Sequence, residues 1–227
     1  MKQLSGKIFH CWHIAFIVGC FLLNPVFTYS QKQTLLSIDG ALYANSDNIA
    51  AHFSVNRNWL FNPSFGISAG VMFAAAPLDI PRWSNAEQTI SYTLDNKSVK
   101  HLNIALSTFY MRPLIGNTGI YGNVSFLFEP IPFDYISIEK RAENDFKQQA
   151  ETIGKLQFSK FSPGIFAEAG LFHHFKRGDK GVRLFIGIGY GWYDMYTACR
   201  IVTLDGQSLS KFLPQNNNYS RFTIRVM

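Results

Sequence analysis

Apolar and polar positions alternate most clearly along residues 182–193. Every even position carries an apolar side chain, from Val182 to Trp192, whereas the odd positions carry Arg183, two aromatic residues and three glycines. A period of two residues predicts a β-strand with unlike faces. In a soluble sandwich the face opposite the aliphatic one would be polar, but here it consists mainly of glycine. The segment therefore predicts a strand with one apolar face and one small, narrow face.

Seven further segments repeat this alternation, and they are spread over the whole chain. Together with the first, they lie at 36–43, 49–55, 64–73, 102–110, 120–129, 165–175, 182–193 and 221–226. Most approach the length of about 9 to 11 residues that a tilted membrane strand needs, and eight is the strand number of the smallest transmembrane barrels. The sequence therefore predicts an all-β fold, an eight-stranded antiparallel up-and-down transmembrane β-barrel.

The connections between these strands alternate in length. Those at 56–63, 113–119 and 176–181 are short and rich in turn residues, whereas three others, at about 74–98, 130–158 and 198–217, are long. Only the first hairpin, around 45–48, is short on the long-loop side. Short turns on one rim and long loops on the other are typical of outer-membrane barrels, with the long loops outside the cell.

The composition agrees with one-sided apolar strands. Of the 227 residues, 15% are aromatic and only 16% are charged, against about 25% charged residues in a typical soluble domain. A mean hydropathy of +0.01 is too low for a bundle of transmembrane helices, so any membrane-spanning segments must be apolar on one face only.

Residues 1–30 predict a secretory signal peptide. Lys2 and Lys7 precede an apolar stretch, and the small residues of Thr28-Tyr29-Ser30 suit cleavage before Gln31. A retained membrane anchor is the alternative, although the apolar run is short for a span and contains Pro25. A second alternative is a lipoprotein signal at 17–20, which would leave Cys20 acylated.

Cleavage at this position changes the charge and the cysteine content. It leaves 19 basic and 15 acidic residues in 31–227, because Lys2 and Lys7 are the only charged residues removed. Cys11 and Cys20 are lost as well, so Cys199 remains alone and no internal disulfide is expected. The positive charges are scattered, which argues against a nucleic-acid partner.

In strand pattern and loop rhythm the chain resembles the small bacterial outer-membrane β-barrels of the OmpX and OmpA-transmembrane-domain type. The resemblance covers residues 34–227 and involves no residue-level motif. Members usually end in an aromatic residue, whereas this chain ends in "RFTIRVM". The resemblance implies residence in the outer membrane of a Gram-negative bacterium, in contact with outer-membrane lipid and lipopolysaccharide.

Two sets of site residues follow from strand direction and face. Charged side chains on the inward faces are expected to form a lumenal charge network of Asp39, Glu129, Glu168, Arg183, Arg221 and Arg225. Outward aromatic side chains at strand ends are expected to form girdles at the membrane interfaces, namely Tyr110, Phe126, Phe128, Tyr190 and Trp192. Eight strands enclose an interior that side chains fill, so a structural network is favoured over an ion path.

We find no catalytic motif, no metal site and no cofactor site. His173 and His174 are adjacent and so face opposite sides of their strand, which also runs away from the outer leaflet. His52 and Ser54 lie on a strand with weak alternation, and both are expected to point into the lumen of the barrel. A lipid A-modifying enzyme remains an alternative, because such enzymes use similar small barrels.

The long loops are the expected place of function. Residues 137–155 contain good helix formers and predict a short helix outside the membrane. Basic residues near the outer rim could neutralise lipopolysaccharide phosphates, although interleaved acids favour an ordinary solvated surface; they are Arg82, Lys97, Lys100, Lys140, Arg141, Lys147, Lys160, Arg200 and Lys211.

The sequence thus favours a non-enzymatic outer-membrane barrel that serves envelope integrity, adhesion or docking of a surface or envelope protein. Besides the lipid A-modifying enzyme, a secreted lipocalin-like barrel with a ligand inside is an alternative. The latter predicts apolar residues in the lumen and polar residues outside, the reverse of the faces assigned above.

Overall fold

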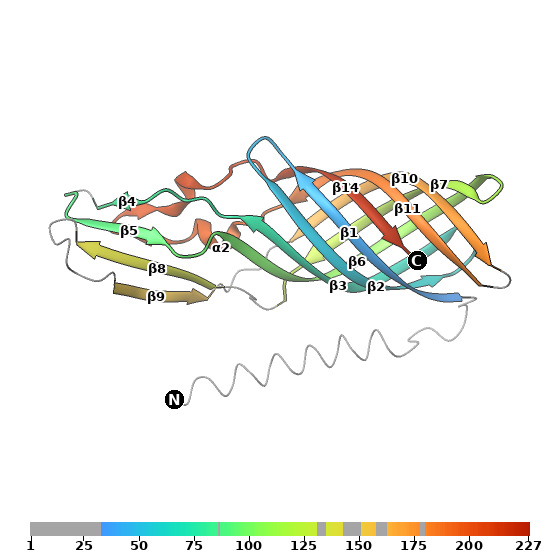
Figure 1. Cartoon of the computed structure of the whole chain (residues 1–227), viewed down its shortest axis with the longest axis horizontal. Coiled ribbons are helices and arrows are strands. Elements are labelled where there is room, and N and C mark those ends of the chain that lie inside the picture. The colour runs from blue at the N-terminus through green and yellow to red at the C-terminus, as the bar shows by residue number, and fades with distance from the viewer. Residues whose placement is uncertain (1–32, 86, 131–134, 143–150, 158–162, 178–179) are drawn as a thin grey trace, which may run out of the picture.

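The chain folds into a closed eight-stranded antiparallel barrel, which confirms the predicted fold (Figure 1). The computed structural model describes residues 33–227 apart from 86, 131–134, 143–150, 158–162 and 178–179, so the predicted signal peptide lies outside the described residues. The barrel strands are β1 (Gln33–Ala44), β2 (Ile49–Leu60), β3 (Phe65–Pro77), β6 (Ser98–Ile115), β7 (Thr118–Phe128), β10 (Gly164–Arg177), β11 (Lys180–Tyr193) and β14 (Asn218–Val226).

The first and last strands close the barrel. β1 pairs with β14 in an antiparallel register that sets Asp39 opposite Arg225 and Leu42 opposite Phe222. Every other barrel strand pairs with its neighbours in sequence order around the ring. Closure leaves no barrel strand with an unpaired edge, which a membrane-spanning sheet requires because lipid offers no hydrogen bonds to the backbone.

The two faces of the wall follow the alternation in the sequence. Leu36 and Ile188 on the outward face are 69% and 71% exposed, whereas Tyr43 and Phe166 on the inward face are fully buried. Large apolar side chains therefore cover the outside of the barrel, as lipid contact requires. The lipocalin-like alternative predicts polar side chains on the outside, so the apolar outer face contradicts it.

We call the end of the barrel with the short connections the turn end. The opposite end carries the three long connections and the β1–β2 hairpin, and we call it the outer end. The barrel strands extend into one predicted loop range, since β3 ends at Pro77 and β6 begins at Ser98. Between these two strands lie two short ones, β4 (Trp83–Ser84) and β5 (Ile90–Leu94). The connection from β7 to β10 contains β8 (Tyr135–Ala142) and β9 (Glu151–Gln157).

Strands β4, β5, β8 and β9 form a separate four-stranded sheet beyond the outer end, visible at the left of Figure 1. The helix predicted within 137–155 is wrong for the described part of that range, which lies in β8 and β9. The helix formers are overridden by pairing with β5, in which Ile138 lies opposite Leu94 and is 2% exposed. Tertiary context routinely outweighs helix propensity in this way.

The connection from β11 to β14 folds against this sheet. It contains a helical turn α2 (Thr197–Arg200), the hairpin β12 (Thr203–Leu204) and β13 (Gln207–Ser208), and a 3-10 turn η1 (Leu209–Phe212). Tyr92 on β5 donates a hydrogen bond to Asp205, and the Gln207 amide donates to the Ser84 carbonyl at 2.8 Å. We call the four-stranded sheet together with residues 194–217 the outer cap.

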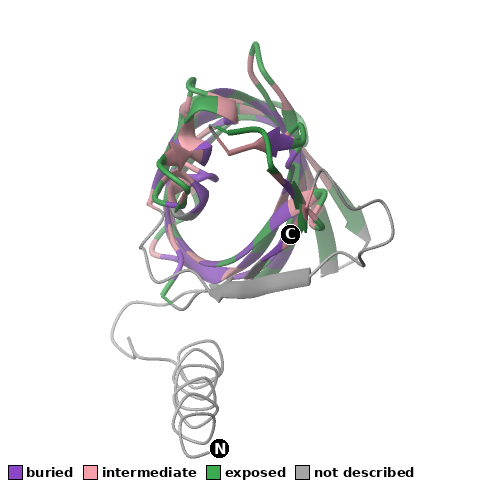
Figure 2. Ribbon diagram, turned by 90° about the vertical axis from the view of Figure 1, so that its left-hand side faces the viewer, coloured by how far each residue is buried: buried purple, intermediate pink, exposed green. Residues whose placement is uncertain are grey.

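Side chains fill the interior in layers. A large apolar cluster spans the outer half of the barrel and the outer cap, and includes Tyr193, Tyr219 and Leu209. A smaller one around Phe109 and Phe185 lies toward the turn end. The opening between ribbons in Figure 2, which looks along the barrel from the outer-cap end, is therefore occupied by side chains. Among the described residues, no helix has the length and apolar character needed to cross a membrane.

Candidate functional site

The centre of the lumen holds a polar layer built around two carboxylates. Asp39 accepts hydrogen bonds from Arg225 Nε at 2.8 Å, from the Asn56 amide at 2.9 Å and from the Ser54 hydroxyl at 3.3 Å. Arg225 reaches it from the adjacent strand across the β1–β14 closure. A buried charge is tolerated only when it is paired and hydrogen-bonded, and Asp39 meets both conditions.

Glu168 forms the second half of this layer. It accepts hydrogen bonds of 2.6 Å from the Tyr121 and Thr223 hydroxyls, and Arg221 Nε lies 3.4 Å from it as an ion pair. The Arg221 guanidinium also lies 5.6 Å from the Tyr43 ring and 5.5 Å from the Phe166 ring. We call these two carboxylates with their partners the lumenal layer; its charges balance.

The six residues of the predicted charge network occupy three heights in the lumen. Asp39, Arg225, Glu168 and Arg221 meet in the lumenal layer. Glu129 instead lies at the outer end of β7, directly after Phe128. Arg183 lies near the turn end, half-buried, and its backbone exchanges hydrogen bonds with Met227. The alternation assigned each residue to the inward face, but it could not assign the height.

His101 contacts Glu129, and the sequence interpretation did not include it. Its Nδ1 lies 2.9 Å from a Glu129 carboxylate oxygen and its Nε2 lies 2.8 Å from the Met195 carbonyl oxygen. The ring therefore bridges the Glu129 carboxylate and the Met195 backbone. The bond to Met195 attaches the start of the outer cap to the barrel wall. The inward position of His101, two residues before Asn103 on the alternating strand, was the available signal.

The predicted girdle residues all lie on the outward face. Tyr110, toward the turn end, is 53% exposed. The other four lie toward the outer end, and the rings of Phe126 and Phe128 are 5.9 Å apart. Tyr190 and Trp192 follow one another on the outward face of β11. Their assignment as membrane-interface anchors stays a prediction.

The histidines and serine considered for catalysis do not form a relay. The Ser54 hydroxyl donates to Asp39, and neither ring nitrogen of His52 has a hydrogen-bond partner among the described residues. His173 bonds instead to the Thr118 hydroxyl at 2.8 Å near the turn end. In the part of the chain that the structure describes, no group of three or more histidine, cysteine or acidic side chains is arranged to hold a metal ion.

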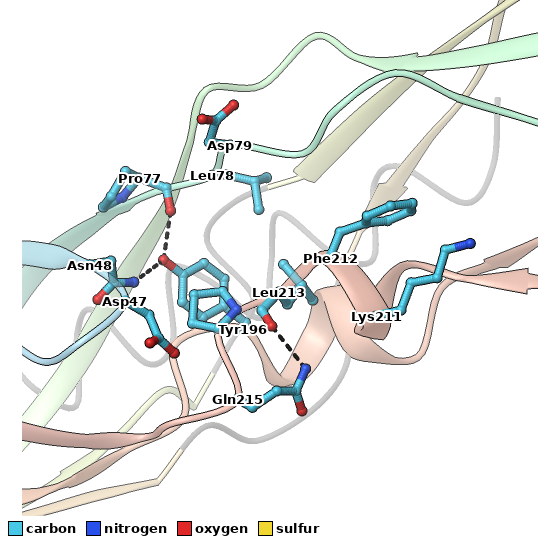
Figure 3. A pocket seen from close by; sticks show the side chains of 11 residues that line it. Asp47, Asn48, Pro77, Leu78, Asp79, Tyr196, Lys211, Phe212, Leu213 and Gln215 are labelled. Carbon is cyan, nitrogen blue, oxygen red and sulfur yellow. Dashed lines mark hydrogen bonds between the residues drawn. The ribbon is translucent and has the colours of Figure 1, made fainter.

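A cavity of about 440 Å³ opens between the outer end of the barrel and the outer cap (Figure 3). We call it the cup. Four segments build it, namely the β1–β2 turn, the end of β3 with the two residues after it, Tyr196 before α2, and the end of η1 with the chain after it. It is lined by Asp47, Asn48, Pro77, Leu78, Asp79, Tyr196, Lys211, Phe212, Leu213, Pro214 and Gln215.

Tyr196 joins the walls of the cup. Its hydroxyl donates to the Pro77 carbonyl oxygen at 2.6 Å and accepts a hydrogen bond from the Asn48 amide. Burial raises the pKa of the Tyr196 phenol, so the hydroxyl keeps the proton that it donates to Pro77. One side chain from the outer cap thus holds the β1–β2 turn and the end of β3 together.

Comparison of the sequence with known proteins identifies no relative. No protein-family model matches the chain, and no curated protein matches it. The solved structures that are similar include three small barrels, each aligned over most of this chain. Neisserial surface protein A is 12% identical with a TM-score of 0.39, covering 86% of this chain and 97% of that one. The N-terminal β-barrel domain of Pseudomonas aeruginosa OprF is 8% identical with a TM-score of 0.37, covering 87% and 99%.

The third is Ail, the attachment invasion locus protein of Yersinia pestis, solved with the heparin analogue sucrose octasulfate. It is 12% identical with a TM-score of 0.33, covering 85% of this chain and 95% of that one. At these identities and scores the matches carry no functional argument. The assignment of this chain to the eight-stranded barrel architecture rests on its own strand pairing.

Proposed function

We propose that this protein is a non-enzymatic outer-membrane barrel that presents a folded docking surface outside the cell, for adhesion or for binding another envelope component. The observation that carries the proposal is the outer cap. It is a sheet and a hairpin held to each other and to the barrel by side-chain hydrogen bonds. An ordered surface of this kind binds a partner with less loss of conformational entropy than free loops would.

The lumen supports docking over transport. The lumenal layer pairs each of its carboxylates with an arginine, and the apolar cluster around Tyr193 and Tyr219 lies between this layer and the outside. An eight-stranded barrel encloses only enough space for side chains to fill. We therefore expect the purified protein to form no ion channels in planar lipid bilayers, and steady single-channel currents would contradict this part of the proposal.

A matched pair of insertions tests the docking surface. One charged epitope is inserted between Asp205 and Gly206 in the outer-cap hairpin, and the same epitope between Gly116 and Asn117 in a turn at the opposite end. Antibody should label the first on intact cells and the second only after the outer membrane is permeabilised. Labelling of the Gly116 insertion on intact cells would contradict the predicted orientation.

The same two variants then report function. Cells that carry either variant are allowed to settle on immobilised envelope fractions and extracellular-matrix proteins, beside cells with the unmodified protein and cells without it. The outer-cap insertion should lower retention to the level of cells without the protein, whereas the turn insertion should preserve it. Equal retention of all four kinds of cell would overturn the docking proposal.

A further inference from the structure

The fold sorts the charged side chains of the chain by their height along the barrel. Every aspartate and glutamate among the described residues lies in the lumenal layer or toward the outer end. At the turn end the strand ends carry six basic residues, namely Arg57, Arg112, Lys176, Arg177, Lys180 and Arg183. The one acid that the sequence places in the β10–β11 turn, Asp179, lies outside the described residues. Positive charge that is scattered along the sequence is therefore concentrated at one end of the barrel.

Three of these cations have no acidic partner in the described part of the chain. Arg112 and Lys176 are exposed and Arg183 is half-buried, and none of the three forms an ion pair with a described residue. Both arginines of the lumenal layer, in contrast, lie beside a carboxylate. The described residues therefore leave the turn end with a net positive charge, which attracts an anionic partner.

Two neighbouring hairpins present the exposed part of this charge. Arg112 lies near the tip of the β6–β7 hairpin and Lys176 near the tip of the β10–β11 hairpin, both at the right-hand end of the barrel in Figure 1. The two hairpins are adjacent in the wall, because β7 pairs with β10 as far as Thr118, which lies opposite His173. The two cations therefore belong to one continuous stretch of the turn end.

Exposed apolar side chains lie beside the cations on both hairpins. Leu114 and Ile115 are 57% and 84% exposed at the tip that carries Arg112, and Phe175 is 54% exposed beside Lys176. Apolar surface of this kind marks a contact with a membrane or a partner. A long basic side chain among apolar neighbours suits the bilayer interface, where its methylene groups lie against apolar surface and its charge reaches the headgroups. The apolar neighbours therefore favour a lipid surface over an acidic protein as the anionic partner.

We propose that the turn end binds the headgroups of anionic phospholipids, with Arg112 and Lys176 at the phosphates and with Leu114, Ile115 and Phe175 against the first methylene groups of the acyl chains. Guanidinium and ammonium groups donate charge-assisted hydrogen bonds to phosphate, and an anionic membrane surface attracts basic residues that lie close to it. In the predicted orientation these lipids belong to the periplasmic leaflet. The inference goes beyond docking at the outer cap, because it assigns a partner to the opposite end of the barrel.

The test compares two lipids that have the same acyl chains and differ in headgroup charge, dimyristoyl phosphatidylglycerol and dimyristoyl phosphatidylcholine. Each is added to the full-length protein in detergent micelles, and native mass spectrometry counts the lipids that stay bound. The protein should retain phosphatidylglycerol in preference to phosphatidylcholine. A higher concentration of ammonium acetate should reduce this preference, because salt screens exposed charges.

Substitutions then locate the surface. Arg112→Gln and Lys176→Gln should each lower the preference for phosphatidylglycerol about 5-fold, and the two together should lower it further. Arg112→Lys keeps the charge and should preserve most of the preference. Lys97→Gln with Arg141→Gln is the matched control, since it removes two exposed cations toward the outer end, and it should leave the preference unchanged. Heat-modifiable migration on a gel confirms that each variant is folded.

Equal retention of the two lipids by the unmodified protein, or a preference that survives the double variant of Arg112 and Lys176, would overturn the proposal. Polyglutamate tests the other class of partner, and it should bind the turn end more weakly than phosphatidylglycerol does. Tighter binding of polyglutamate that depends on Arg112 and Lys176 would identify a soluble acidic polymer as the partner and would also overturn the proposal. The cell-retention experiment changes neither residue, so failure of docking and failure of lipid binding are distinguishable.

Discussion

The lumenal layer and the cup differ in whether their carboxylates are paired with a cation. In the lumenal layer Asp39 and Glu168 each lie beside an arginine and accept hydrogen bonds from neighbouring strands. In the cup Asp47 and Asp79 have no cationic partner among the described residues, although Lys211 lines the same cavity. A buried charge is costly unless it is paired, whereas an exposed carboxylate is stabilised by water and needs no partner. The comparison therefore assigns stability to the buried pairs of the lumenal layer, whereas the exposed aspartates of the cup contribute no ion pair to the fold.

The largest effect expected from breaking this comparison is in the lumenal layer. Arg225→Met leaves the Asp39 carboxylate buried without its ion-pair partner, and should lower the free energy of unfolding by about 3–5 kcal/mol. Urea unfolding in lipid vesicles, followed by tryptophan fluorescence, measures the loss.

The matched variant is the double substitution Asp39→Asn with Arg225→Met. It removes both charges and keeps an amide oxygen that can accept from Asn56 and Ser54. It should therefore be clearly more stable than Arg225→Met alone. If the single and double variants unfold at the same urea concentration, the ion pair does not stabilise the barrel and the comparison with the cup fails.

A second, smaller effect concerns the glycines that face the lumen on β11. A methyl group added at Gly187 would collide with the Tyr121 hydroxyl, which donates to Glu168 at 2.6 Å. Gly187→Ala should therefore displace Tyr121 and destabilise the barrel by about 1–3 kcal/mol. Gly122→Ala is the control, since the nearest atom to its added methyl group is 3.9 Å away. Equal stability of the two variants in the same urea assay would show that the lumen has room at Gly187.

The barrel wall could be predicted from the sequence because the two-residue period is a local property that closure preserves. Each of the eight alternating segments became a barrel strand, and the inward glycines of "VRLFIGIGYGWYD" lie where Tyr121 and other large side chains fill the lumen. The same reasoning assigned six charges to one face. It could not separate Glu129 and Arg183 from the lumenal layer, because alternation gives a side and not a height.

The outer cap and the cup could not be predicted in the same way. β4 has two residues and shows no period, and β5 pairs with β8 across about 50 positions of sequence, as between Ser91 and Arg141. The helix formers after position 137 favoured the wrong element, because pairing with β5 was not visible locally. The cup combines Asp47, Asp79 and Gln215 from three segments, and only the folded chain brings them together.

The smallest effect is expected at the contact between the four-stranded sheet of the outer cap and the β12–β13 hairpin. Tyr92 is 3% exposed, and burial together with its hydrogen bond to Asp205 raises the pKa of the Tyr92 phenol from 10.0 to about 12. The folded state therefore holds this proton more tightly than the unfolded state does. The stabilising contribution is complete below pH 10 and is lost as the pH rises from 10 toward 12.

Trp83 reports this change, because its ring stacks on Tyr92 at 5.6 Å between centroids. Raising the pH from 10 to 12 should change the Trp83 fluorescence as the Asp205 hairpin detaches, and the barrel should stay folded on a gel. In Tyr92→Phe the phenol is absent, so this step should disappear, and at pH 7 the hairpin should be cleaved somewhat faster by protease because one hydrogen bond, worth about 1 kcal/mol, is lost. Trp83→Phe identifies the part of the signal that comes from this tryptophan. A fluorescence step that persists unchanged in Tyr92→Phe would mean that another group, and not the Tyr92 proton, holds the hairpin to the sheet.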